Sequence, residues 1–175
     1  EYVDVLLPDL CNVIRGKRLG ADSIRKVYDG ELQIPSSIEL LDVTGGCTDA
    51  GGRGFSDGDP DVLILPVEGT LSRVPWGPPG AAQVMGSLYE LDHTPCHVDP
   101  RHVLASVVRR FNELGLHPVV AVELEFYLID AESAKSHKPR PPVLPDSGRR
   151  ASATQVYSLS DLDGITRFLS EVKSA

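Results

Sequence analysis

The chain has 175 residues, of which 41% are hydrophobic and 24% charged, and such fractions are typical of a folded globular protein. Its formal net charge of −8 offers no basic surface for phosphates, so nucleic acid is not an expected partner. Three cysteines without C-x-x-C spacing indicate reduced thiols in the cytoplasm. No apolar run is long enough to cross a bilayer, so no membrane partner is expected.

The first part of the chain alternates short apolar runs with turn residues, and this pattern predicts short strands. Asp22 is the expected cap of one small helix over residues 22–28, which Gly30 ends in a left-handed conformation. Several strands and one small helix predict a compact α+β domain. The expected strands cover residues 2–7, 12–19, 38–43, 62–67, 70–74 and 82–91.

A glycine- and aspartate-rich stretch, residues 44–61, separates two of these strands. Its composition predicts a long loop, and loops of this length are commonly functional. Its aspartates lack the spacing and the final glutamate of a calcium-binding loop, so an EF-hand is not expected.

A helix is predicted from Asp99 to Gly115. Asp99 can cap it, Pro100 suits its first position, and Gly115 suits its end. Apolar residues recur between these ends at intervals of three and four, which predicts one face that packs against another element.

The run VVAVELEFYLID, residues 119–130, is the most strand-like part of the chain. Alternate side chains of a strand share a face, so Glu123 and Glu125 would point the same way, opposite a wholly apolar face. Two carboxylates about 7 Å apart repel by about 2 kcal/mol at an effective dielectric near 20. Divalent cations such as Mg²⁺ or Mn²⁺ would relieve this repulsion. A solvated strand face is the alternative, and the motif E-x-E alone excludes neither.

A polar, proline-rich segment, residues 131–153, is predicted to be a surface loop. After it, Ser160 is the expected cap of a final helix whose apolar residues recur at helical spacing. That apolar stripe requires a packing partner, and few elements near it in the chain could supply one.

Six segments in this order resemble the glutamine synthetase family, and especially its γ-glutamylpolyamine synthetase branch. The motif E-x-E-F in a strand is moderately specific, whereas the ordered set is strongly so. The segments are YVDVLLPDLCNVIRGKRL, LLDVTG, GTLSRVPW, DPRHVL, VELEFYLID and QVYSLSDLD.

The resemblance implies a β-grasp-like N-terminal domain over residues 1–94. Residues 95–175 would then be the first strand-and-helix part of a glutamine synthetase-type catalytic domain, whose remainder lies outside this chain. The family forms ring-shaped homo-oligomers with active sites between subunits. It uses ATP to phosphorylate the γ-carboxylate of glutamate, and an amine then displaces phosphate. On this basis we expect the chain by itself to be inactive.

The resemblance also assigns roles to four residues. Glu123 and Glu125 correspond to ligands of two separate Mg²⁺ or Mn²⁺ ions, and Tyr157 to a tyrosine beside the amine site. Asp42 corresponds to the aspartate of the N-terminal domain that receives ammonium from across the subunit interface. The stretch around Asp42, LDVTGG, departs from the D-G-S-S form of ordinary glutamine synthetases. This departure favours a bulkier amine, such as putrescine or another polyamine, over ammonium.

Two other functions stay open. A non-catalytic relative that binds or assembles without turnover would carry altered metal ligands in the rest of the protein. A hydrolase with a pair of catalytic carboxylates is a third possibility, although two acids on one strand are poor support for its geometry.

Overall fold

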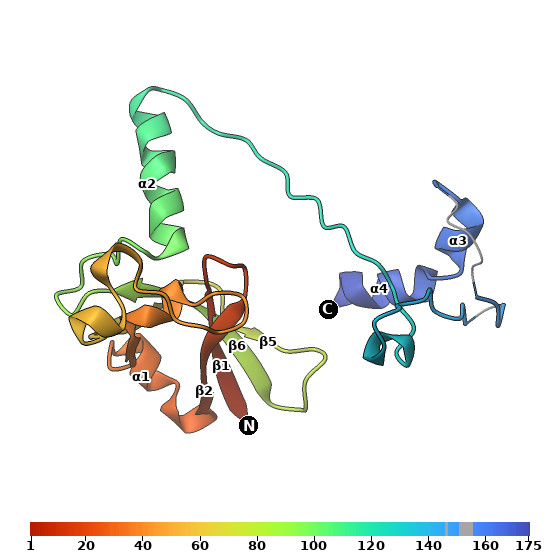
Figure 1. Ribbon diagram of the computed structural model, residues 1–175, viewed down its shortest axis with the longest axis horizontal. Helices are drawn as coiled ribbons and strands as arrows, with labels where there is room; N and C mark the ends of the chain where they lie inside the picture. Colours follow the sequence, from red (N-terminus) through yellow and green to blue (C-terminus); the bar gives the residue numbers. More distant parts are fainter. Residues whose placement is uncertain (146, 151–155) are drawn as a thin grey trace. The chain divides into compact units, whose positions relative to one another are not determined.

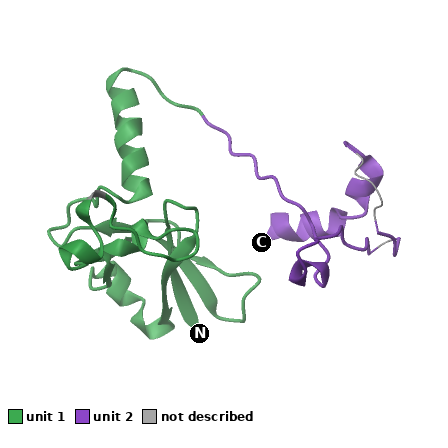
Figure 2. Ribbon diagram, viewed as in Figure 1, with its two compact units in different colours: residues 1–119 green, residues 120–175 purple. Residues whose placement is uncertain are grey.

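The computed structural model describes residues 1–145, 147–150 and 156–175. Within it the chain forms two compact units, residues 1–119 and 120–175 (Figure 2). The first unit combines a curled sheet with helices (Figure 1), which confirms the predicted α+β class. No helix in the described part of the chain is long and apolar enough to cross a membrane.

The strands of the first unit join in one mixed sheet, in the order β2-β1-β6-β4-β3, with β5 beside β6. β1 and β6 are parallel, and the other pairs are antiparallel. The Lys17 ammonium on the edge strand β2 donates to the Gln33 carbonyl on the other edge strand, β3, at 2.5 Å. The strands are β1 Tyr2–Pro8, β2 Ile14–Gly20, β3 Gln33–Pro35, β4 Asp61–Pro66, β5 Ser72–Arg73 and β6 Ala81–Tyr89.

The hydrophobic core lies on one face of this sheet. Along β1 every second side chain is buried, as the alternation of a half-buried strand requires. α1, Arg25–Tyr28, contributes one fully buried residue to the same core. The buried core consists of Val3, Val5, Leu7, Val27, Leu32, Ile34, Val62, Ile64, Val84, Leu88 and Cys96.

The predicted strand over residues 38–43 is wrong. Ser36–Leu40 form a 3₁₀ turn, η2, and β3 ends before it. The Asp59 carboxylate accepts the amide and the hydroxyl of Ser37, at 3.0 and 2.8 Å, within this turn and directly before the predicted strand. Within residues 38–43, the strand pairing that the structure describes is limited to the isolated bridge between Leu41 and Cys47.

Smaller differences concern the first hairpin and its helix. β2 begins at Ile14 rather than residue 12, because the buried Asp9 carboxylate closes a turn over the intervening residues. Asp22 makes no side-chain cap, and the helical residues divide into a 3₁₀ turn and α1. Gly30 has φ +73°, which confirms the left-handed end predicted for it.

α2, Pro100–Glu113, begins where it was predicted. One Asp99 carboxylate oxygen accepts the Arg101 amide at 2.7 Å, and the other accepts the Leu88 amide of β6 at 2.6 Å. His102 is half-buried, and its Nε2 lies 3.0 Å from the Leu88 carbonyl oxygen. These contacts attach the start of α2 to the sheet.

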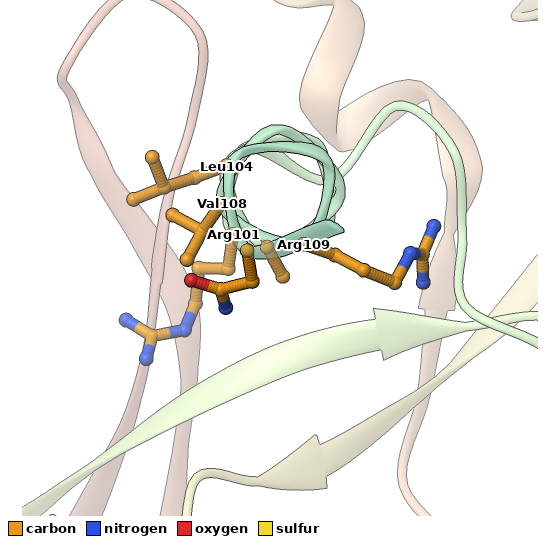
Figure 3. A pocket seen from close by; sticks show the side chains of 6 residues that line it. Arg101, Leu104, Val108 and Arg109 are labelled. Carbon is orange, nitrogen blue, oxygen red and sulfur yellow. The ribbon is translucent and has the colours of Figure 1, made fainter. Parts of the chain in front are cut away.

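The rest of α2 does not pack as its periodicity predicts, since none of its residues is buried. A shallow hollow lies along the helix (Figure 3), and all six of its lining residues belong to α2 itself. Leu104 and Val108 contribute apolar surface to it, and Arg101 and Arg109 add charge. This face is thus open within the first unit.

The strand predicted over residues 119–130 is not formed. These residues adopt neither a helix nor a paired strand. Both of its expected faces are open: Val120 and Leu124 are 84% and 86% exposed, and Val119 and Tyr127 are 94% and 93% exposed. A strand needs a neighbour for its backbone N–H and C=O groups, and among the described residues only the backbone of Asp130 has partners, its amide donating to the Arg140 carbonyl oxygen at 2.9 Å.

The second unit ends in two short helices, α3 Leu159–Asp163 and α4 Thr166–Ser174, in place of the single predicted helix. The cap is Ser158, whose hydroxyl accepts the Asp161 amide at 3.3 Å, rather than Ser160. In the preceding segment, Arg150 donates to the Asp130 carboxylate at 2.7 Å. Residues 146 and 151–153 of the predicted surface loop lie outside the described residues.

Candidate functional site

Asp42 lies in a tight loop that follows η2. Its Oδ1 accepts three hydrogen bonds, from the Thr44 amide at 2.7 Å, the Thr44 hydroxyl at 2.6 Å and the Gly46 amide at 2.9 Å. Leu41 and Cys47 form an isolated antiparallel bridge at the base of the loop. A side chain this well bonded has a defined direction, although the residue is exposed.

The electrostatics of the loop keep Asp42 ionised. The Thr44 hydroxyl, followed by the amides of Gly46 and Thr44, lowers the pKa of the carboxyl below its ordinary value. Oδ2 has no hydrogen-bond partner among the described residues. A Cβ at position 46 would lie 2.8 Å from Oδ2, so glycine allows the carboxylate its position. One oxygen is therefore fixed, and the other is available to an incoming hydrogen-bond donor.

Glu123 and Glu125 lie in the second unit, on the exposed stretch described above. Their carboxylates are hard oxygen donors of the kind that Mg²⁺ and Mn²⁺ prefer. Within the described ranges, however, no group of three or more His, Cys, Asp or Glu side chains could hold a metal ion. The two glutamates thus fit such an ion by donor type, and a complete coordination shell would need further ligands.

Tyr157 is 99% exposed, with φ +57°, and directly precedes the Ser158 cap of α3. Asp42 belongs to the first unit, whereas Tyr157 and the two glutamates belong to the second. Within the described residues, neither unit alone assembles the four predicted site residues.

Sequence reasoning missed Glu39. Its side chain is buried on η2, where the residue is 2% exposed, and its Oε2 has no partner among the described residues. Burial, followed by the nearby negative charges of Asp99 and Asp9, raises its pKa to about 8. No local sequence pattern predicts that Glu39 is buried, because its burial arises from packing between segments that lie far apart in the chain.

We compared the sequence and the fold of this chain with those of known proteins. Residues 97–175 match the family model described as "Glutamine synthetase, catalytic domain". A solved structure titled "Crystal structure of novel glutamine synthase homolog" shares the fold, with a TM-score of 0.55 and 23% sequence identity. The match covers 65% of this chain and 27% of that one. The chain belongs to the glutamine synthetase family, as the ordered segments predicted.

Two curated relatives are similar in sequence. Gamma-glutamylputrescine synthetase PuuA of Escherichia coli (strain K12) is 36% identical over 98% of this chain and 36% of its own length. Glutamate–isopropylamine ligase of Pseudomonas sp is 32% identical over 70% of this chain and 27% of its own length. The chain thus spans about a third of the relatives it matches, and both of them are named for joining glutamate to an amine.

Proposed function

We propose that the complete protein is an ATP-dependent ligase that joins an amine to the γ-carboxylate of glutamate through γ-glutamyl phosphate. Its membership of the glutamine synthetase family carries this proposal, and the names of both relatives support it. In this reaction the γ-carboxylate takes the terminal phosphoryl group of ATP. The amine nitrogen then bonds to the carbon of the γ-carboxyl group and loses a proton, while the bond from that carbon to the phosphate oxygen breaks and phosphate leaves.

A polyamine such as putrescine is the proposed acceptor, with ammonium as the alternative. The relative that aligns with 98% of the chain is named for putrescine. The LDVTGG stretch and the long loop after it also favour a larger amine. An alkylammonium group is a hydrogen-bond donor, and the free Oδ2 of an ionised Asp42 is a suitable acceptor for it.

The other site residues keep the roles that the resemblance implies. Glu123 and Glu125 would bind separate Mg²⁺ or Mn²⁺ ions, and Tyr157 would lie beside the amine. Such ions, when bound, neutralise charge on the transferring phosphoryl oxygens.

The organisation of the complete protein is also proposed. β1 and β6, the first and last strands in chain order, are adjacent and parallel within the sheet, which supports a β-grasp-like domain over residues 1–94. Residues 95–175 would begin the catalytic domain, close to the start of the family match at residue 97. We further propose a cytoplasmic enzyme that forms ring-shaped homo-oligomers and that needs more than residues 1–175 for turnover.

ADP release by the complete protein tests the activity. With ATP, glutamate and Mg²⁺ present, putrescine should stimulate release more strongly than ammonium does at equal concentration. Stimulation by ammonium alone would overturn the polyamine assignment. If neither amine stimulates release, the protein is instead a non-catalytic binding or assembly relative.

A further inference from the structure

The strongest feature outside the four predicted residues is a charged contact beneath the Asp42 loop, defined here as residues 41–48. We propose that Arg15 is a positioning residue for this loop, and that it orients the Asp42 carboxylate for the amine by tying the loop to the first hairpin. The inference rests on the proposed function of Asp42.

Asp9 is the fixed end of this contact. Its side chain is fully buried, and its Oδ1 accepts the amides of Cys11 and Val13 at 2.9 and 2.8 Å. Its Oδ2 accepts Arg15 Nε at 2.7 Å. Burial by itself raises the pKa of Asp9, but the Val13 amide, the Arg15 guanidinium and the Cys11 amide outweigh it and lower the pKa overall. Asp9 is thus an ionised, immobile anchor.

Arg15 joins this anchor to the loop through a second arm of the same guanidinium. While Nε pairs with Asp9, Nη2 donates to the Asp42 carbonyl oxygen at 2.8 Å. The guanidinium is planar and rigid, so fixing one arm fixes the direction of the other. Arg15 is largely buried, with 17% of its side chain exposed, which limits competition from water.

Three further contacts close the base of the loop. The Cys11 thiol, in the same hairpin turn, lies 3.6 Å from the Leu41 carbonyl oxygen. The Leu40 carbonyl accepts the Thr48 amide at 3.1 Å and the Thr48 hydroxyl at 2.8 Å. With the base closed, the contact from Arg15 to the Asp42 peptide sets how the carboxylate is presented.

Arg15→Lys tests this role in the complete enzyme. A lysine can still pair with Asp9, so the anchor keeps its countercharge, but a single ammonium lacks the second rigid arm. Arg18→Lys is the matched control, because Arg18 lies on the same strand and pairs with Asp4 at 2.7 Å. Arg15→Lys should raise KM for the amine about three- to tenfold, the factor that corresponds to one hydrogen bond. KM for glutamate and for ATP should stay within about twofold in both variants.

Amide hydrogen exchange of the Asp42 loop provides a readout that does not need activity. Arg15→Lys should accelerate exchange of the Thr44 and Gly46 amides, whereas Arg18→Lys should leave it unchanged. Unchanged exchange in Arg15→Lys overturns the proposal, and so does faster exchange with an unaltered amine KM. If the unaltered enzyme shows no amine-dependent ADP release, the proposed function fails, and the exchange result still decides whether Arg15 holds the loop.

Discussion

Glu39 is a carboxyl group enclosed in the first unit, close to the carboxylates of Asp9 and Asp99 and to the Arg15 guanidinium. Its raised pKa means that the folded protein binds the Glu39 proton more tightly than the unfolded chain does. Between the ordinary value of 4.5 and about 8, the folded state therefore holds a proton that the unfolded state has lost. The contribution of Glu39 to stability is complete below pH 4.5 and declines as the pH rises to about 8.

Glu39→Gln should remove this pH dependence, because an amide of the same shape has no proton to lose. At pH 8 the variant should be more stable than the unaltered chain by about 2–4 kcal/mol, and near pH 4.5 the two should be similar. Urea unfolding followed by circular dichroism at several pH values measures the difference. Glu31→Gln, at an exposed position, is the control, and a parallel pH dependence in all three proteins would contradict the assignment.

Gly16 shows a second single-residue constraint. Its φ is +142°, and a Cβ there would lie 1.7 Å from the Val5 carbonyl oxygen on the neighbouring strand. Gly16→Ala should lower the free energy of unfolding by about 2–4 kcal/mol, since neither backbone can move without breaking the pairing of β1 with β2. Gly20→Ala is matched to it on the same strand, where φ is −61° and the nearest atom would be 3.6 Å away. Gly20→Ala should change the free energy of unfolding by less than about 0.5 kcal/mol, and urea unfolding measures both variants.

At the scale of elements, Asp99 holds α2 on the sheet. Asp99→Ala removes both the helix cap and the acceptor for the buried Leu88 amide, so it should destabilise the first unit by about 2–3 kcal/mol. Ser158→Ala removes only a cap, from the short helix α3, and should have an effect of about 1 kcal/mol or less. Thermal unfolding of both variants measures the two losses of stability. Equal losses would show that the hydrogen bond from the Leu88 amide to Asp99 does not stabilise the protein.

Residues 119–130 show how an element can be encoded without being formed. Their alternation is strand-like and their side chains favour a pleated surface, yet an isolated strand leaves its backbone groups without partners. The apolar face of α2 likewise meets nothing that buries it within the first unit. Periodicity thus indicates which side of an element will be buried, while burial itself depends on a second surface.

At the scale of the whole molecule, the proposed metal ligands can be tested only in the complete protein, where further donors would be present. Glu123→Gln and Glu125→Gln should each weaken Mn²⁺ binding by about 10- to 100-fold and remove most amine-dependent ADP release. Titration calorimetry with Mn²⁺ measures the affinity. Glu132→Gln is the control, because Glu132 is exposed and, among the residues that the structure describes, pairs only with Lys135, at 2.9 Å. Unchanged Mn²⁺ affinity in the two site variants would rule out their role as ligands.

The sequence alone determined what depends on neighbours along the chain. The apolar run that turn residues close predicted β1, the Asp99-Pro100 start predicted α2, and the ordered segments predicted the family. Glu123 and Glu125 stood out by spacing alone, and their role as metal ligands stays a prediction.

Only the tertiary structure decided what depends on residues far apart in the chain. Residues 36–40 form a 3₁₀ turn in which Ser37 is bonded to the distant Asp59, and Glu39 became a buried acid beside Asp9 and Asp99. Arg15 reached the Asp42 loop across 27 residues. The physical reason is the same in each case: desolvation and side-chain hydrogen bonds depend on contacts that local sequence patterns do not specify.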